Sequence, residues 1–252
     1  MAIAIRNAKE IKSIANASVL VDRALRKVKE NAVVGITLEE LDEIADDFIR
    51  SCNAIPAFKG LYGFPKSICL SVNEVIIHGI PNDYVLKDGD ILGVDIGVNL
   101  NGWYGDAATT FGIGEISNDN KKLIDCSYTV LMEAIKNINV GMRFKQLSAL
   151  LFELITNKGF VPLKGFCGHG IGTNPHEEPE IPNFIKGDIM QGPKIKNGMV
   201  FCIEPMICFK SGEARILNDN WSVVSQDGLN GSHHEHTIAI IDNKAVILSR
   251  EQ

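Results

Sequence analysis

Apolar residues recur at a helical period near the start of the chain. Within residues 7–31 the apolar positions fall on one face of a helix: Ile11, Ile14, Val21, Leu25 and Val28. This pattern predicts an amphipathic helix that stops at Gly35. A second helix is predicted to begin at Thr37, because Thr37 and Glu40 have the spacing of a capping box. Its inner face would be formed by Leu41, Ile44, Ala45 and Phe48.

Strand patterns follow these two helices. Residues 67–72 and 74–77 are typical of short strands. The β-rich runs 90–98 and 103–111 flank Asn101-Gly102, and such a pair between strands is a strong hairpin signal. Later in the chain the pattern predicts two helices and four strands, near 118–138, 143–158, 199–209, 214–217, 221–226 and 235–248. Helices and antiparallel strands in this order indicate the α+β class.

The second half of the chain resembles the first. Val34-Gly35-Ile36 recurs as Val140-Gly141-Met142 at an offset of 106, and Lys87-Asp88-Gly89 recurs as Lys196-Asn197-Gly198 at an offset of 109. Any one match could arise by chance, but the matches keep their order along the chain. We therefore expect a single domain over 1–252, built from two pseudo-symmetric halves of roughly 7–115 and 116–252.

The same alignment pairs acidic residues. Asp95 falls on Glu204, and with an insertion in the second half Asp106 falls on Glu235. Asp95 and Glu204 each lie in an apolar strand, where a charge without a partner is rare. Two facing halves would bring all four carboxylates to one centre.

The hairpin geometry predicts how close two of these carboxylates lie. With Asn101-Gly102 as the turn, Asp95 faces Ala108 and Asp106 is its diagonal neighbour. If the turn shifts by one residue, Asp95 faces Asp106 directly. Both registers place the two carboxylates on one face within about 8 Å of each other. Like charges at that distance are unfavourable unless a cation lies between them.

One histidine joins the four carboxylates as a candidate metal ligand. His169 has Gly168 and Gly170 on either side, which allows backbone or ligand to approach the imidazole closely. One imidazole and four carboxylates favour a pair of Mn, Fe, Co or Zn ions over a structural zinc site. Two such ions can activate a shared water, so hydrolysis is the expected reaction. The spacing alone does not say whether a peptide, an ester or a phosphate is cleaved.

The remaining histidines carry weaker signals. Strand alternation places only His233 on the same side as Glu235, with His234 and His236 pointing away, so this tract is interpreted as mainly structural. His78 and His176, taken alone, are also more often structural than functional.

Composition excludes several classes of protein. The chain of 252 residues has a formal charge of −6, without the basic footprint of a nucleic-acid-binding protein. Its six cysteines form no C-x-x-C pair, which argues against a zinc ribbon or a disulfide framework and favours the cytoplasm. No apolar run is long enough to span a membrane. The glycines form no P-loop or dinucleotide fingerprint, and G-x-S-x-G and H-E-x-x-H motifs are also missing.

Several of these segments together resemble the type I methionine aminopeptidases. The likeness runs over nearly the whole chain, with the candidate ligands in order, and is carried by residues 73–81, 88–106, 167–179, 204–206 and 235–237. It implies the pita-bread fold of creatinases and aminopeptidases, an α+β fold of two pseudo-symmetric halves with antiparallel sheets flanked by helices. It also implies removal of the initiator methionine from nascent proteins and peptides when the second residue is small, by hydrolysis at a two-metal centre.

The resemblance gives each candidate metal ligand a role. It implies that Asp95 chelates one metal ion and that Asp106 and Glu235 bridge both ions. His169 and Glu204 would bind the other ion, and Glu204 would also be a proton shuttle. The expected cofactors are thus two divalent ions, of Co, Mn, Fe or Zn.

The resemblance also extends the site beyond the metal ligands. His176 is similar to a histidine that stabilises the tetrahedral intermediate, and His78 to one that contacts the substrate backbone near the leaving group. The wall of the methionine pocket is expected to contain Phe64, Cys69, Trp221 and Leu61. Leu61 and Pro175 depart from the family pattern, since many relatives have aromatic residues at these positions of the pocket. The backbone of Asn73 and Val75 is expected to hold one monovalent cation.

Other functions stay open at this point. A proline-specific aminopeptidase would share the fold, but such enzymes are usually longer and have additional active-site histidines. A non-catalytic binding module is disfavoured because all five ligand positions are retained, and a binuclear phosphoesterase has only the metal chemistry in its favour. The resemblance implies a cytoplasmic monomer that acts on the N-termini of nascent polypeptides, without membrane or nucleic-acid specificity. A transient contact with the ribosome is an additional expectation.

Overall fold

The computed structural model describes residues 2–251, so the first and last residues of the expected 1–252 domain lie outside the described part. The helices are α1 (Ala8–Asn31), α2 (Leu38–Ser51), η1 (Leu61–Gly63), α3 (Asn118–Lys136) and α4 (Phe144–Asn157). The strands of the first half are β1 (Ile55–Pro56), β2 (Cys69–Val72), β3 (Val75–Ile77), β4 (Ile91–Leu100) and β5 (Trp103–Gly112). Those of the second half are β6 (Val161–Pro162), β7 (Cys167–Gly170), β8 (Glu177–Pro182), β9 (Val200–Ile203), β10 (Met206–Cys208), β11 (Ala214–Ile216), β12 (Val223–Ser225), β13 (Gly231–His233), β14 (His236–Ile241) and β15 (Lys244–Ile247).

The first two helices begin at capping boxes. Thr37 accepts a hydrogen bond from the Glu40 N–H, and the Glu40 carboxylate accepts one from the Thr37 N–H, which confirms the predicted start of α2. Asn7 and Glu10 form the same arrangement at the start of α1. Each cap satisfies N–H groups that have no partner within the helix.

The β4–β5 hairpin sets the position of two carboxylates. Asn101 and Gly102 both have positive φ, at 54° and 83°, as the tight turn between twisted strands requires. Asp95 pairs with Ala108, and Gly97 pairs with Asp106. Of the two predicted registers, the structure therefore has the one with Asn101-Gly102 as the turn.

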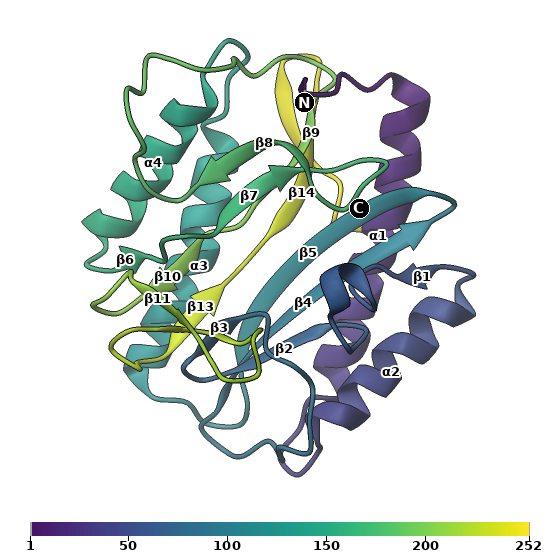
Figure 1. The fold of residues 1–252 in the computed structure, drawn as a ribbon, viewed down its shortest axis with the longest axis vertical. Coiled ribbons are helices and arrows are strands. Elements are labelled where there is room, and N and C mark those ends of the chain that lie inside the picture. The colour runs from purple at the N-terminus through teal and green to yellow at the C-terminus, as the bar shows by residue number, and fades with distance from the viewer. Residues whose placement is uncertain (1, 252) are drawn as a thin grey trace.

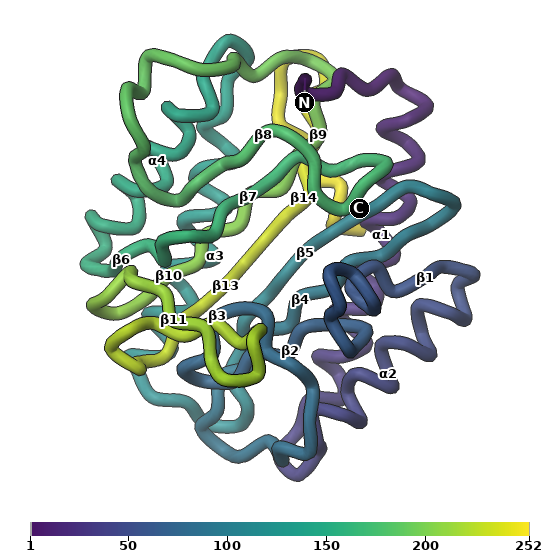
Figure 2. The backbone as a smooth tube through the Cα atoms, viewed as in Figure 1, coloured from purple at the N-terminus to yellow at the C-terminus, as the bar shows by residue number. Residues whose placement is uncertain are grey.

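Two antiparallel sheets carry the site. In one sheet β4 pairs with each of β1, β2 and β5. In the other sheet the strands follow the order β15-β14-β9-β7-β8. The sheets meet where β5 runs beside β14 (Figure 2), and the Thr237 hydroxyl links them by donating to the Asp106 carbonyl at 2.7 Å. The Glu235 N–H donates to the Ala108 carbonyl at 2.9 Å. This seam brings the acidic residues of both halves together.

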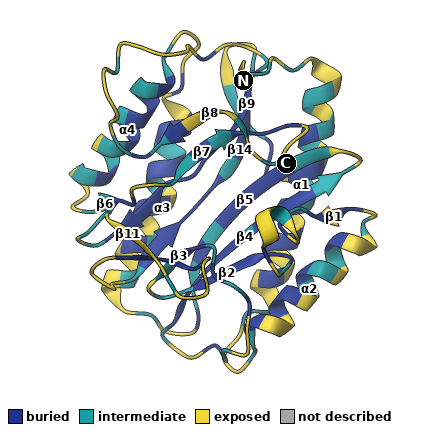
Figure 3. Cartoon of the chain, in the orientation of Figure 1, coloured by how far each residue is buried: buried dark blue, intermediate teal, exposed yellow. Residues whose placement is uncertain are grey.

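Helices cover the strands on the sides away from this seam. α1 contacts β4 and β5, while α3 contacts β10 and β13 and α4 contacts β8. In Figure 1 the helices α1 and α2 lie to the right of the strands and α3 and α4 to the left. Figure 3 shows buried residues along the central strands and exposed residues on the outer faces of the helices. The arrangement matches the α+β architecture expected for the pita-bread fold.

Matching hydrogen bonds link corresponding segments of the two halves. The Gly35 N–H donates to the Leu86 carbonyl, and Leu86 N–H donates back to Ile36. At the offsets found in the sequence, Gly141 N–H donates to Ile195 and Ile195 N–H donates back to Met142. A duplicated half would produce this correspondence, and the division near residue 115 stays a prediction.

Some strand predictions were wrong in detail. The strand expected over 199–209 is divided into β9 and β10, because Pro205 has no N–H to continue a ladder. The strand expected over 235–248 is a hairpin whose turn residues Asp242 and Asn243 have positive φ. Strands β1, β6, β7, β8 and β13 were not predicted, because β1, β6 and β13 have only two or three residues and β7 and β8 contain Gly or Pro, which are depleted in strands. Within residues 2–251, none of the helices has the length and apolar character to cross a membrane.

Candidate active site

A cavity of about 490 Å³ opens over the seam between the two sheets. It is lined by the five predicted metal ligands, by His78 and His176, and by four predicted pocket residues: Phe64, Cys69, Trp221 and Leu61. The structure thus brings together residues that are up to 174 positions apart, from Leu61 to Glu235. Asn73 and Val75 are not among the lining residues.

Three carboxylates converge at the floor of this cavity. Asp95 on β4, Asp106 on β5 and Glu235 between β13 and β14 each offer an oxygen, and these atoms lie within 4.8 Å of one another. One oxygen of each carboxylate is buried without a hydrogen-bond partner. Buried polar atoms are rarely left unpaired in proteins, so three in one place indicate a ligand.

The electrostatics of these carboxylates point the same way. Burial raises the pKa of Asp95 to about 6. Burial, together with the charges of Glu235, Asp95 and Glu204, raises the pKa of Asp106 well above its usual value. A divalent cation would offset both causes of the raised pKa values, burial and the neighbouring negative charges. It would replace the lost hydration and balance the like charges.

His169 is held so that one ring nitrogen faces the carboxylates. Its Nδ1–H donates to the Gly170 carbonyl at 3.0 Å, which leaves Nε2 with its lone pair directed inward. Nε2 lies 3.5 Å from Glu204 Oε1 and 3.8 Å from Glu235 Oε1. Burial lowers the pKa of His169 to about 3, which favours the neutral, metal-binding form.

The glycines beside His169 are needed for close packing. A Cβ on Gly168 would lie 2.5 Å from the Cys202 carbonyl oxygen, and one on Gly170 would lie 2.1 Å from that of Glu178. Strand β7 therefore fits between its neighbours only without side chains at these two positions. The donor set of one imidazole and four carboxylates, with its unpaired buried oxygens, fits a pair of divalent ions.

Two further histidines stand on the cavity wall. The rings of His176 and His169 meet edge to face with centroids 4.5 Å apart, and the ring of Tyr62 stacks on His176 at 6.2 Å. His78 contacts Phe166 and Trp221 through its ring. Burial lowers the pKa of His176, and burial with the nearby His233 and His176 lowers that of His78 to about 4. Both imidazoles are therefore neutral near pH 7 and able to donate one N–H each.

An apolar side pocket adjoins the carboxylates. Phe64 and Trp221 meet edge to face at 5.1 Å, and Phe58, Cys69 and Leu61 complete the cluster. The main chain at Trp221 is held by its backbone N–H, which donates to Asp219 Oδ1 at 2.9 Å. A slot with two aromatic walls and no charge of its own suits an unbranched apolar side chain.

The Asn73–Val75 turn lies outside the cavity. The Asn73 side-chain amide donates to Asp90 Oδ1 at 2.8 Å, and its oxygen accepts from the Ile91 N–H at 3.0 Å. The main-chain carbonyl of Asn73 accepts from the Gly231 N–H at 3.2 Å. Asn73 has a positive φ of 55°, so the turn is tightly bent. A monovalent cation at this turn stays a prediction.

Sequence reasoning missed several residues that line the cavity, among them Phe58, Tyr62, Phe166 and His233. His233, interpreted as structural, lines the cavity, and its buried Nε2 lies 3.6 Å from Glu204 Oε2 without a hydrogen bond. The rule of strand alternation correctly placed it on the side of Glu235, and this was the only signal available. His234 and His236 do not line the cavity, and their Nδ1 atoms pair with Ser127 Oγ at 2.8 Å and Ser249 Oγ at 2.9 Å.

Comparison with known proteins gives a consistent result. Residues 12–242 match the model of metallopeptidase family M24. A methionine aminopeptidase of Helicobacter pylori is 60% identical over 251 residues, covering 99% of both chains. The crystal structure of a methionine aminopeptidase from Thermotoga maritima matches with a TM-score of 0.95 at 36% identity, over 99% of this chain and 100% of that one. A prolidase from Pyrococcus furiosus shares the fold, with a TM-score of 0.79 at 22% identity, but this chain covers only 66% of its length.

Proposed function

The chain belongs to metallopeptidase family M24, and we propose that it removes the N-terminal methionine of proteins and peptides whose second residue is small. The observation that carries the proposal is the position of an apolar pocket directly beside a cluster of metal-binding carboxylates. A methionine side chain would enter the pocket, and its peptide bond would then lie over the carboxylates.

Members of this family bind divalent metal ions, and the proposed ligands divide between two of them. Asp95 would hold one ion, and Asp106 and Glu235 would each hold both ions, because the oxygens of these three carboxylates converge. Glu204 and His169 would hold the second ion, since Glu204 Oε1 and His169 Nε2 lie 3.5 Å apart. Cobalt, manganese, iron and zinc all suit such a donor set. When bound, the two ions lower the pKa of a shared water and polarise the carbonyl of the substrate.

The protein's own residues would orient the substrate and transfer the proton. Burial and the charge of Asp95 raise the pKa of Glu204 well above its usual value, which suits a carboxylate that accepts a proton from water and passes it to the leaving amine. His176 stands at the edge of His169, where its N–H would donate to the carbonyl oxygen as negative charge develops there. His78 stands beside Trp221, where it would contact the substrate backbone.

The pocket would select methionine mainly through buried apolar area. Removing such a side chain from water contributes about 1.5–3 kcal/mol. Because one methylene more or less changes kcat/KM by only about 10–200-fold, side chains close in size would be poor rather than inactive substrates. The flat aromatic walls of Phe64 and Trp221 would disfavour branched residues.

The remaining proposals concern the setting of the reaction. The substrates would be the N-termini of nascent polypeptides, met in the cytoplasm by a monomeric enzyme that contacts the ribosome transiently. The main-chain oxygens of Asn73 and Val75 would hold one monovalent cation.

The test is a peptide assay on purified protein reconstituted with Mn, Co, Fe or Zn. We expect release of methionine from Met-Ala peptides, much slower release from Met-Lys peptides, and none after chelation. Glu204→Ala and Asp106→Ala should abolish turnover, while Asp125→Ala, which changes an exposed carboxylate on α3, should not. Preference for Xaa-Pro peptides, or no turnover with any of the four metals, would overturn the proposal.

A further inference from the structure

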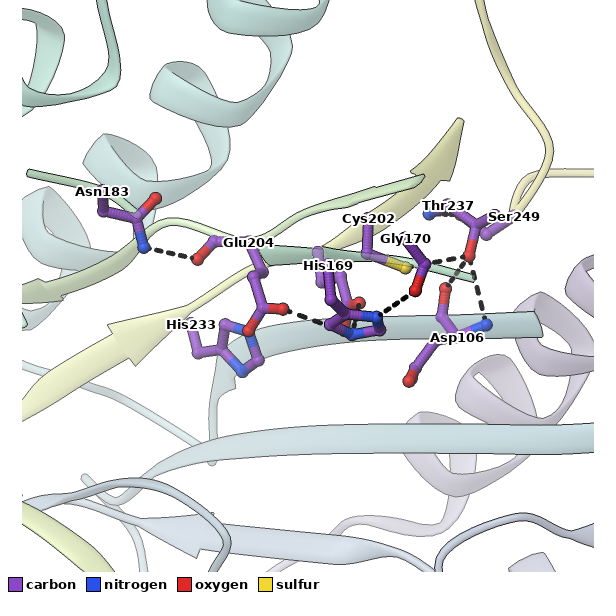
Figure 4. A network of polar contacts seen from close by, with 10 residues as sticks. Asp106, His169, Gly170, Asn183, Cys202, Glu204, His233, Thr237 and Ser249 are labelled. Carbon is purple, nitrogen blue, oxygen red and sulfur yellow. Dashed lines mark hydrogen bonds and ion pairs between the residues drawn. The ribbon is translucent and has the colours of Figure 1, made fainter. Parts of the chain in front are cut away.

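His233 is a buried imidazole whose inner nitrogen has no hydrogen-bond partner. Its side chain is 4% exposed, and Nε2 is buried and unpaired. His233 lines the cavity, and its Nε2 lies 3.6 Å from Glu204 Oε2. In Figure 4 the ring of His233 lies against the carboxylate of Glu204, on the side opposite His169.

The two oxygens of Glu204 therefore face different imidazoles. Oε1 faces His169 Nε2 at 3.5 Å, and Oε2 faces His233 Nε2. A ring nitrogen that binds a metal presents a lone pair, and one that carries hydrogen donates to an oxygen. Since Oε1 and His169 are placed to share a metal ion, the remaining oxygen is available to accept a hydrogen bond.

The backbones on both sides of this contact are fixed. The His233 N–H donates to Thr110 Oγ1 at 3.0 Å, and the Thr110 hydroxyl donates back to the His233 carbonyl at 2.8 Å. The carbonyl of Glu204 accepts from Asn183 Nδ2 at 2.9 Å. A separation of 3.6 Å is longer than a hydrogen bond, so a bond between the two side chains requires the Glu204 carboxylate to rotate toward His233.

The neighbouring histidines do not share this position. His234 and His236 lie within three residues of His233 and are also largely buried, but each pairs with a serine hydroxyl away from the cavity. Burial on this segment therefore does not by itself leave an imidazole without a partner. The orientation of His233 toward Glu204 is specific to the site.

We propose that His233 is a positioning residue that donates a hydrogen bond from Nε2 to Glu204 Oε2 and so directs Oε1 toward the metal ion shared with His169. The inference rests on the proposed two-metal function, and it adds a residue to which the resemblance gave no role. Without this donor Glu204 rotates, and the ion it shares with His169 is held less tightly. The ion held by Asp95 should be little affected.

The experiment measures metal binding directly. Manganese is titrated by calorimetry into the chelator-treated full-length protein as wild type, His233→Leu and His233→Gln, with His234→Leu as the matched control. Wild type should bind two ions. His233→Leu should bind one of them about 10–100-fold more weakly, as loss of a hydrogen bond to a metal ligand typically does. His233→Gln should recover the affinity, because its amide NH₂ can donate to the same oxygen.

The matched control separates the proposed contact from general damage. His234→Leu removes a buried imidazole and the bond to Ser127, so it should lower stability without weakening either ion. Peptide assays at saturating manganese add a second readout, in which His233→Leu lowers kcat more than it raises KM. The visible spectrum of the cobalt-loaded protein should keep its coordination pattern in His233→Gln.

The outcomes distinguish this inference from the proposed function. If wild type binds two ions and His233→Leu binds both equally well, His233 does not position Glu204. If His233→Gln fails to restore affinity and changes the cobalt spectrum, His233 is itself a metal ligand and the inference is wrong. If wild type binds no divalent ion, the proposed function fails first.

Discussion

Asp95 and Asp106 lie diagonally across the β4–β5 hairpin, and each keeps one buried carboxylate oxygen without a hydrogen-bond partner. Asp95 faces Ala108 and Asp106 faces Gly97, so small residues fill the opposite positions and leave space between the two acids. The fold thus places two like charges in a region of low dielectric, where they repel. Such an arrangement lowers stability in the metal-free protein and becomes favourable when a divalent cation binds.

The first prediction concerns the stability of the protein without metal. Asp106→Asn should stabilise the chelator-treated protein, by about 1–3 kcal/mol near pH 8, because it removes a buried charge beside Asp95 and Glu235. The pKa of Asp106 is raised by burial and then by these charges, so the wild type gains stability as pH falls and loses it as pH rises through the folded-state pKa. The advantage of the variant should therefore be larger at pH 8 than at pH 5, as measured by urea unfolding.

The same variant has an opposite effect when metal is present. Manganese should stabilise the wild type and leave Asp106→Asn nearly unchanged, because the variant lacks a ligand. Asp125→Asn, which neutralises an exposed acid, should behave as wild type in both conditions. A destabilised metal-free Asp106→Asn would contradict the view that these carboxylates repel one another.

Local sequence rules predicted the hairpin and its acids well. The Asn101-Gly102 turn fixes the register, and the register fixes which face Asp95 and Asp106 share. Thr37 and Glu40 located a helix start for a similar reason, since the interaction is contained within one turn of chain. Chemistry that depends on a few neighbouring residues can be derived from sequence alone.

Long-range geometry limited the rest. The role of His233 depends on Glu204 lying opposite its ring. In the sequence the two residues are separated by the segment that forms β11 and β12. Strands β7 and β8 were missed because glycine and proline are rare in strands, although the packing of β7 against its neighbours requires glycine at 168 and 170. The resemblance, not periodicity, supplied the substrate pocket around Trp221.

A second prediction tests that packing. Gly170→Ala should weaken metal binding and activity about 10–100-fold, because its Cβ would meet the Glu178 carbonyl oxygen at 2.1 Å and displace the strand that carries His169. Gly93→Ala is the matched control, since Gly93 also lies in a strand near a proposed ligand but its Cβ would meet nothing closer than 3.5 Å. Calorimetric titration with manganese compares the two variants. Equal affinities in both would show that β7 tolerates a side chain at this site.

A third prediction concerns selectivity. Trp221→Ala should lower kcat/KM for Met-Ala-Ser about 10–200-fold, because the methionine side chain loses one wall of its pocket. The loss should be smaller for peptides that begin with a larger residue such as phenylalanine, which would gain space. Trp103→Ala serves as a control, since Trp103 packs against Arg6 and does not line the cavity. Equal losses for all peptides would mean that Trp221 supports the fold rather than the pocket.

The last prediction concerns acid sensitivity and uses a histidine outside the cavity. Burial, followed by the nearby His233, His236 and Lys29, lowers the pKa of His234 to about 3, and its Nδ1 pairs with Ser127 Oγ. The unfolded chain binds a proton at this residue near pH 6.5, whereas the folded chain does not. Stability contributed by His234 is therefore present above about pH 6.5 and is lost as pH falls toward 3, at up to about 1.4 kcal/mol per pH unit. His234→Gln removes this titration while keeping a polar group near Ser127. In urea unfolding of chelator-treated protein, the variant should lose less stability than the wild type between pH 7 and pH 5. Because the other buried histidines titrate alike in both proteins, the difference isolates His234, and parallel losses would show that its imidazole takes up a proton without unfolding.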